Sequence, residues 1–322
     1  KISVRDFFLD PARCAEAWRA SAAILREDFG DLIPPRKPSP APLSYGHLAC
    51  LGAPVTIPDH GDGEPNITPF ADSIDEGIRI LRDAKGMDYA KHELYRHYVE
   101  VWEHLKAAFP EEDIPFSGMG VEGPLTSAGL MRGQGFFMDI YDEPEKSVTF
   151  LTLMVDSAVE FIKQTRRTNG QAPMQPSGGI ADEFASLIPP ALWPEMVIPM
   201  LNRQYEGTTN GPGRSLHLEN LSPRHLPFLS QLRLTHFQPS VSNLLTLENV
   251  KANLDPAIPF DWLLYAYRVT EMSDSEISDW VDEAARAGVQ KIRTQFGAYA
   301  YMAGKTDRIK AFVAAFDKYR AR

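Results

Sequence analysis

The feature that most constrains the fold is an alternation of two kinds of segment, which begins near residue 73 and continues to the end of the chain. Stretches with apolar residues at helical spacing are separated by short apolar or alternating runs bounded by Gly and Pro. The short runs predict strands at residues 114–122, 172–178, 214–220, 232–238, 250–255 and 291–297. Long helices between them, such as 145–167 and 190–205, favour parallel strands, because a parallel connection needs a long crossover.

The predicted fold class is α/β, as a single (β/α)8 barrel. Polar residues of chemical interest follow several different strands, which is typical of a barrel mouth rather than of an open sheet. We expect the barrel to occupy residues 45–322. Residues 1–44 are expected to form an amino-terminal extension with a helix near residues 10–28, because the proline-rich run at 34–42 cannot continue a helix or form a central strand.

Composition excludes several classes of function. The 322-residue chain carries 33 basic and 43 acidic residues, for a formal charge of -10, which repels nucleic acid and anionic membrane surfaces. Two cysteines, Cys14 and Cys50, are too few for a disulfide framework, so a reducing cytoplasm is expected. No apolar run is long enough to span a bilayer, and no glycine-rich loop indicates nucleotide binding. A small molecule is the expected ligand of a monomer or homodimer.

The run 215–220 carries the main candidate site. Side chains alternate across a strand, so His217 and Glu219 are expected on one face of it. The pair could be a satisfied polar pair that lines the barrel. It could hold zinc together with His236 from the next strand, since His nitrogen and Glu oxygen are both zinc ligands. It could also act in acid and base catalysis without a metal.

Other candidates lie at further strand ends. Glu122 directly precedes Gly123 and Pro124, where a carboxylate must be solvated, paired or functional, and it is a third catalytic candidate. Asp182 has an alternative role as the acid at a helix amino terminus, and Asp255 has one as the residue that shapes an Asx-type turn. The candidates for substrate binding are Asp182, Asp255, Arg293, Gln295 and Tyr299.

Several motifs resemble the uroporphyrinogen decarboxylase superfamily, which also contains corrinoid-dependent methyltransferases. The most specific is Ala252-Asn253-Leu254-Asp255-Pro256, which is similar to that superfamily's Gly-Asn-Leu/Val-Asp-Pro. Gly120 to Thr126 resembles its Gly-Pro-Phe-Thr turn, and His217-Leu218-Glu219-Asn220 falls where methyltransferase-like members have His-x-Cys-Gly-Asn. The resemblance implies one α/β barrel with its site at the carboxyl ends of the strands.

The departures from the family pattern bear on the reaction. The decarboxylase Asp, Tyr and His positions fall near Leu43 or Ser44, at Leu130 and at Ala298, so the resemblance does not favour porphyrinogen decarboxylation. In the methyltransferase branch a His and two Cys hold zinc. Here His217 matches, Glu219 replaces one Cys, and Ala298 stands at the other position.

The leading functional hypothesis is therefore a methyltransferase that moves a methyl group between a small substrate and a corrinoid. An O-methyl compound fits better than a thiol, because carboxylate ligation makes zinc a harder Lewis acid. The resemblance implies a corrinoid protein as partner, and zinc as a cofactor. A metal-free decarboxylase or lyase acting on a carboxylated small molecule or tetrapyrrole is one alternative, and a non-catalytic ligand-binding barrel is another.

Overall fold

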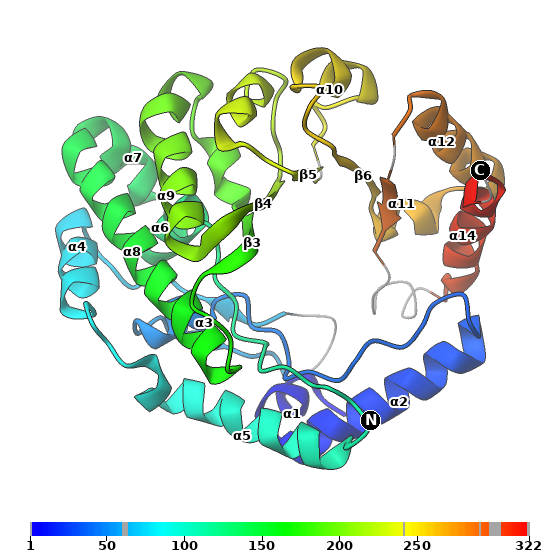
Figure 1. The fold of residues 1–322 in the computed structure, drawn as a ribbon, viewed down its shortest axis with the longest axis horizontal. Coiled ribbons are helices and arrows are strands. Elements are labelled where there is room, and N and C mark those ends of the chain that lie inside the picture. Colours follow the sequence, from blue (N-terminus) through cyan, green and yellow to red (C-terminus); the bar gives the residue numbers. More distant parts are fainter. Residues whose placement is uncertain (1, 60–63, 241, 290, 296–303, 321–322) are drawn as a thin grey trace.

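A computed structural model describes residues 2–59, 64–240, 242–289, 291–295 and 304–320 (Figure 1). The strands are β1 (Val55–Thr56), β2 (Asn66–Ile67), β3 (Gln175–Ala181), β4 (Thr209–Leu218), β5 (His236–Pro239), β6 (Asp261–Leu264) and β7 (Lys291–Thr294). The α-helices are α1 (Val4–Leu9), α2 (Pro11–Phe29), α3 (Gly46–Cys50), α4 (Ile74–Asp83), α5 (Glu93–Ala108), α6 (Pro124–Arg132), α7 (Gly135–Asp142), α8 (Pro144–Thr168), α9 (Ile198–Thr208), α10 (Leu247–Asn253), α11 (Ala266–Glu271), α12 (Asp274–Arg286) and α14 (Thr306–Arg320). Shorter helical turns are η1 (Tyr89–Lys91), η2 (Glu183–Leu187), η3 (Pro190–Leu192), η4 (Trp193–Val197) and η5 (Leu226–Leu232).

Parallel strands form the inner layer of a ring, with helices outside them (Figure 1). One sheet has the order β3-β4-β5, and a second pairs β6 with β7, all in parallel. A bridge from Phe237 to Phe260 joins the two sheets, and a parallel bridge from Leu43 to Met119 extends the arc beyond β3. Within the described ranges no strand pairing joins β7 to the Leu43 segment. The parallel α/β arrangement is thus present, while closure of an eight-stranded barrel is not shown.

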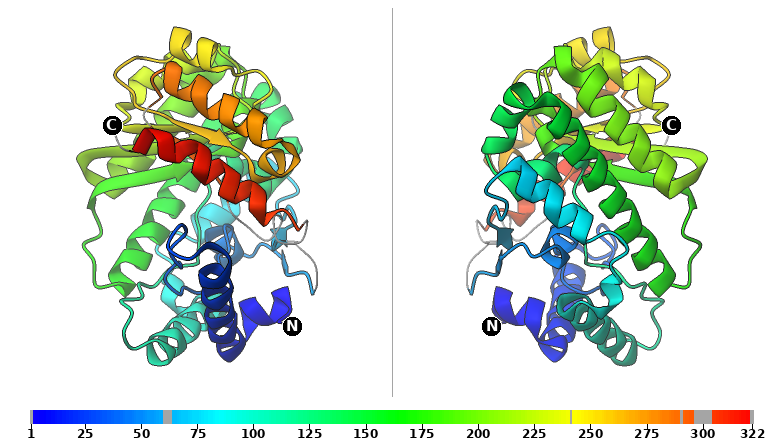
Figure 2. Two further views of the ribbon diagram at one scale, coloured as in Figure 1. Left: turned by 90° about the vertical axis from the view of Figure 1, so that its right-hand side faces the viewer. Right: turned by 90° about the vertical axis from the view of Figure 1, so that its left-hand side faces the viewer.

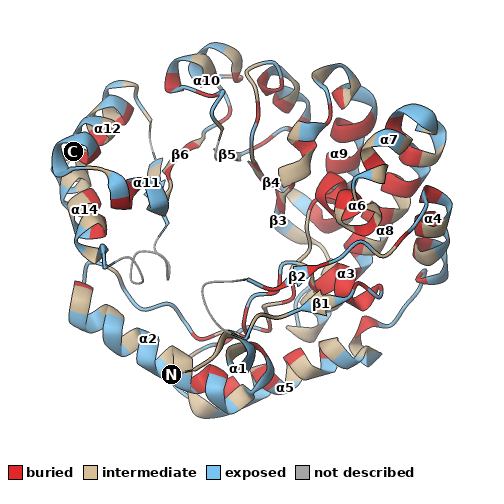
Figure 3. Cartoon of the chain, turned by 180° about the vertical axis from the view of Figure 1, so that it is seen from behind, coloured by how far each residue is buried: buried red, intermediate tan, exposed pale blue. Residues whose placement is uncertain are grey.

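The outer layer is held by apolar helix faces. The longest helix, α8, begins with Pro144 at a position where its missing N–H costs nothing, and it packs against α4 and α9. Its inward stripe includes the fully buried Phe150, Leu151 and Met154, as expected of an amphipathic helix. Buried residues accordingly lie on the faces that helices turn toward the strands (Figure 3).

The structure corrects two predicted strands. Residues 114–122 form no strand and contribute only the isolated bridge at Met119. Residues 250–255 belong mostly to helix α10, which begins after Thr246 with a reciprocal capping box to Asn249. The capping box supplies acceptors for backbone amides that have no partner within the helix, and so stabilises the helix start. The short apolar run had indicated a strand instead. The strand that follows this helix is β6, which begins only at Asp261. A reciprocal capping box between Ser273 and Glu276 begins α12, which lies beside α14 (Figure 2).

The amino-terminal segment packs against the ring. Helix α2 contacts α5, and the Trp18 indole donates to the Ser39 carbonyl at 2.7 Å, which fixes the proline-rich run against that helix. The chain then enters the ring at Leu43, whose amide donates to the Gly118 carbonyl at 2.6 Å. Among the residues placed in the structure, no helix combines the length and apolarity needed to cross a membrane.

Candidate active site

His217 and Glu219 leave the carboxyl end of β4 side by side, as their alternation predicted. His217 is near the end of the strand and Glu219 follows it, with Nε2 of His217 3.6 Å from Oε1 of Glu219. Burial lowers the pKa of His217, but hydrogen bonds with Glu219 and Gln238 and the charges of Glu183 and Glu219 raise it by more. The two side chains are therefore in contact and half-buried.

Glu219 is held by three partners. Its interaction with His217 is the largest cause of a lowered pKa, and the hydroxyls of Ser240 and Tyr265 donate to Oε1 at 3.1 and 3.2 Å. These donors stabilise the carboxylate form. Ser240 follows β5 and Tyr265 follows β6, so three neighbouring strand ends converge on one carboxylate.

Glu183 is a site residue that the sequence did not single out. Its Oε1 lies 3.9 Å from Nε2 of His217, and its Oε2 accepts from the Thr126 hydroxyl at 3.2 Å. It opens the turn η2 after β3. The only signal in the sequence was its position next to Asp182, which was itself interpreted as an acid at a helix start.

Glu122 lies in the same group of carboxyls. Burial raises the pKa of Glu122 to about 9, with further rises from Glu183 and Asp182 and an opposing hydrogen bond with Ser44. A carboxylic acid with this pKa keeps its proton at neutral pH and can donate it. Among the described residues of the site, Glu122 is thus the strongest candidate for a general acid.

Asp182 is a structural residue beneath this group. It is fully buried, and its carboxylate accepts from the amides of Leu125 and Thr126 at 3.0 and 2.8 Å and from the Thr126 hydroxyl at 2.8 Å. Asp182 stands at the start of the following helical turn η2, as the sequence predicted, but its side chain caps the start of α6 and makes no capping hydrogen bond to η2. Burial raises the pKa of Asp182 to about 7 despite these donors.

His236 is not brought to His217. It begins β5 opposite Ser215, and its Nε2 lies 3.2 Å from Oδ2 of Asp261. Among the residues that the structure describes, no group of three His, Cys, Asp or Glu side chains is arranged to hold a metal. The predicted zinc set of His217, Glu219 and His236 is thus not assembled, because His236 lies two residues before the position opposite His217 and is turned to another partner.

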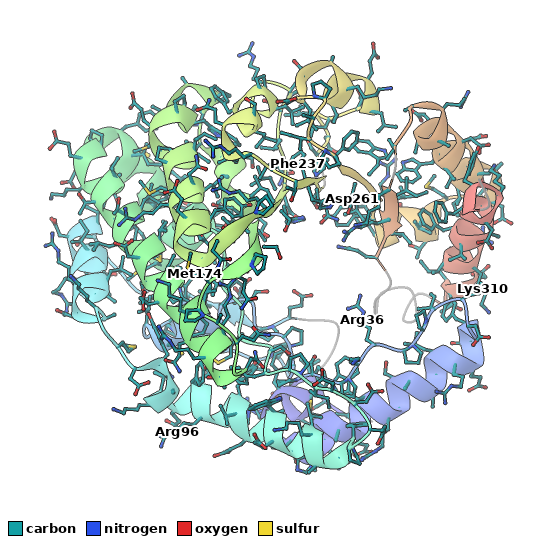
Figure 4. The ribbon with its side chains drawn as sticks, in the orientation of Figure 1. Arg36, Arg96, Met174, Phe237, Asp261 and Lys310 are labelled. Atoms are coloured by element: carbon teal, nitrogen blue, oxygen red, sulfur yellow. The ribbon has the colours of Figure 1, made fainter. Side chains whose placement is uncertain are left out.

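The remaining substrate-binding candidates are dispersed. Oδ1 of Asp255 accepts from the Ala257 amide at 2.9 Å, which is the Asx-type turn foreseen as its alternative role. Arg293 lies in β7 and contacts Asp261, which is fully buried at the start of β6 on the central side of the ribbon (Figure 4). Gln295 is exposed just after β7, and Tyr299 lies outside the described residues.

Two cavities bear on the location of the site. One of about 230 Å³ is lined by Ser44, Tyr45 and Glu64 together with Phe7, Phe8, Pro42 and Pro65. Ser44 contacts Glu122, and the pKa of Tyr45 is raised by burial and then by Glu122, Glu64 and Glu183. A larger cavity of about 930 Å³ lies between α4, η1, α8 and α9, and neither His217 nor Glu122 lines it. The smaller cavity is the one that adjoins the acidic group.

Comparison with known proteins fixes the family. Residues 45–254 match the family uroporphyrinogen decarboxylase (URO-D). A solved structure, a methyltransferase from Methanosarcina mazei, superposes with a TM-score of 0.69 at 15% sequence identity, covering 99% of this chain and 89% of that one. A search of curated proteins found no match. The matched span is 210 of 322 residues, and the chain therefore belongs to the uroporphyrinogen decarboxylase family.

Proposed function

We propose that the protein is a methyltransferase that moves a methyl group from a small O-methyl compound to a corrinoid supplied by a partner protein. The observation that carries the proposal is a proton-bearing Glu122 that is hydrogen-bonded to Glu183, whose Oε1 lies 3.9 Å from Nε2 of His217. Removal of a methyl group from an ether or alcohol leaves an oxygen anion, which needs a proton. The site holds an acid that is protonated at neutral pH and able to supply it.

Each residue of the site has a role in this reaction. The carbon–oxygen bond breaks, the methyl group passes to the corrinoid, and the oxygen takes the proton of Glu122. Glu183, which contacts the Thr126 hydroxyl, helps to keep that proton in place, because its charge disfavours ionisation of Glu122. His217 orients the substrate oxygen by donating a hydrogen bond from the end of β4, and Glu219 holds the His217 ring in place.

The lining disfavours the alternative of a lyase acting on a carboxylated substrate. Glu183 and Glu219 add negative charge on the side where such a substrate would have to bind, and like charges repel. A non-catalytic barrel is disfavoured as well. Strongly shifted carboxyl pKa values next to a His–Glu pair are typical of reactive sites rather than of passive linings.

Zinc, implied by the methyltransferase branch, does not fit the three residues predicted to hold it, since His236 is turned to Asp261. The acid and hydrogen-bonding roles of the site are filled by the side chains of this chain alone.

The test is a methyl-transfer assay with free cob(I)alamin and a panel of O-methyl donors. The absorbance change of the corrinoid measures the reaction. We expect turnover with at least one donor, and a loss of about 100-fold or more in kcat for Glu122→Gln. Glu195→Gln, an exposed acid on η4, is the matched control and should retain full activity. Complete inactivity of the wild-type protein with every donor, or full activity of Glu122→Gln, would contradict the proposal.

A further inference from the structure

Gln238 lies between His217 and Arg293 and contacts both. The strand register places Gln238 directly opposite His217, and one terminal atom of its amide is 2.8 Å from Nδ1 of the imidazole. The other terminal atom is 3.2 Å from both Nη1 and Nε of Arg293. The three side chains thus form a continuous chain from β7 through β5 to β4.

The guanidinium decides which way the amide faces. Arginine nitrogens only donate hydrogen bonds, so the atom of Gln238 that faces them must be the oxygen. The amide nitrogen then faces Nδ1 of His217 as a donor. An amide in the opposite orientation would place two donors against each other at Arg293, which is a repulsive contact.

The orientation of Arg293 is itself fixed. Its guanidinium pairs with the carboxylate of Asp261, which is fully buried, and Lys291 approaches the same carboxylate at 3.4 Å. A buried carboxylate that lost such partners would be strongly penalised, so the pair is held firmly. The position of Arg293 is therefore set from below by β6, independently of His217.

We infer that Arg293 is a positioning residue that acts through Gln238 to hold His217 as the neutral imidazole with its proton on Nε2. Nδ1 must accept from the Gln238 amide and cannot carry a hydrogen. The Nε2 hydrogen then points into the site, where the charged groups facing it are Glu219 at 3.6 Å and Glu183 at 3.9 Å. Arg293 is the cation on the opposite side.

The inference refines the proposed function and rests on it for its chemical meaning. A fixed Nε2 hydrogen makes His217 a hydrogen-bond donor toward an acceptor atom of the substrate, such as an ether or alcohol oxygen. It does not make His217 a base that takes a proton from the substrate. The substrate class that suits the site is thus one with an acceptor oxygen close to the transferred methyl group.

The experiment reads the tautomer directly and does not depend on turnover. The full chain, labelled with ¹⁵N-histidine, is studied by long-range ¹H–¹⁵N correlation at neutral to mildly alkaline pH, and the His217 signals are assigned by their loss in His217→Asn. Wild type should show the Nε2-protonated pattern. Gln238→Glu should change it to the Nδ1-protonated pattern, because a carboxylate accepts from both Arg293 and Nδ1.

Arginine variants test the role of Arg293 itself. Arg293→Met should give a mixture of tautomers, because the amide is then free to turn, and Arg293→Lys should restore the wild-type pattern. Lys291→Met is the matched control, since Lys291 contacts Asp261 but not Gln238, and it should leave the pattern unchanged. An Nδ1-protonated or doubly protonated His217 in wild type, or an Arg293→Met spectrum identical to wild type, would overturn the inference. An inactive wild type with the expected spectra would refute the methyltransferase proposal alone.

Discussion

The hydroxyl of Thr126 donates to Oδ1 of Asp182 at 2.8 Å and so ties the start of α6 to the end of β3. The same hydroxyl lies 3.2 Å from Oε2 of Glu183, and it accepts from the Phe184 amide at 2.9 Å. One buried threonine therefore connects the structural carboxylate with a carboxylate of the site. The support beneath the site and the site itself can be separated by mutation.

Substitution of Asp182 should mainly affect stability. Asp182→Ala leaves the amides of Leu125 and Thr126 and the Thr126 hydroxyl without their acceptor in a fully buried place, at a cost of about 3 kcal/mol or more in the free energy of unfolding. Urea unfolding at constant pH measures this. Asp142→Ala, an exposed acid at the end of α7, is the control and should change the free energy by less than about 0.5 kcal/mol. Equal midpoints for the two variants would show that the cap carries no stability.

Stability should fall as the pH rises, because the folded state holds protons that the unfolded chain releases. Glu122 has a pKa of about 9 in the folded protein against 4.5 as the ordinary value, and Asp182 about 7 against 3.8. Their stabilising contribution is complete below about pH 4 and is lost as the pH rises through 7 and then 9. Unfolding midpoints at pH 6 and pH 9 test this.

Glu122→Gln isolates the share of one carboxyl in that pH dependence. The neutral amide cannot ionise, so the variant should lose less stability than wild type between pH 6 and pH 9. Glu195→Gln should keep the wild-type slope, because Glu195 is exposed. A slope in Glu122→Gln as steep as that of wild type would mean that Glu122 ionises normally.

Gly123 should not tolerate a side chain. A Cβ at this position would lie 2.3 Å from Cβ of Asp182 and 2.7 Å from the carbonyl oxygen of Ala181, so Gly123→Ala should lower the melting temperature strongly or prevent folding. Gly179→Ala is the matched control on the neighbouring strand, where the close atom is the rotatable hydroxyl of Ser215 at 2.8 Å. Thermal unfolding of both variants decides the matter, and similar melting temperatures would contradict the close approach at Gly123.

His236→Ala should leave metal content unchanged. Nε2 of His236 faces Asp261, at a place separate from His217 and Glu219. Elemental analysis of wild type, His236→Ala and His217→Ala tests this point together with the zinc expected from the sequence. Loss of zinc in His236→Ala would mean that His236 reaches the site in the metal-bound protein.

Much of the site's local geometry follows from the sequence, because it depends on neighbours along the chain. The alternation of β4 places His217 and Glu219 on one side whatever the rest of the fold does. The Gly123-Pro124 turn likewise places Glu122 at the end of its segment. The helix α8 is a local feature too, and it was predicted correctly at residues 145–167.

Contacts between distant segments were decided by the tertiary structure alone. Glu183, Gln238 and Tyr265 join the site only because parallel strands in register bring their ends together, and no spacing in the sequence encodes that register. Asp182 caps α6 and not the helical turn that follows it, and His236 pairs with Asp261. Buried polar groups need a partner, and the fold decides which partner is near. The sequence determined that His217 and Glu219 stand together at the end of one strand. Packing determined which of them meet and which carboxyl keeps its proton, because desolvation depends on neighbours from the whole chain.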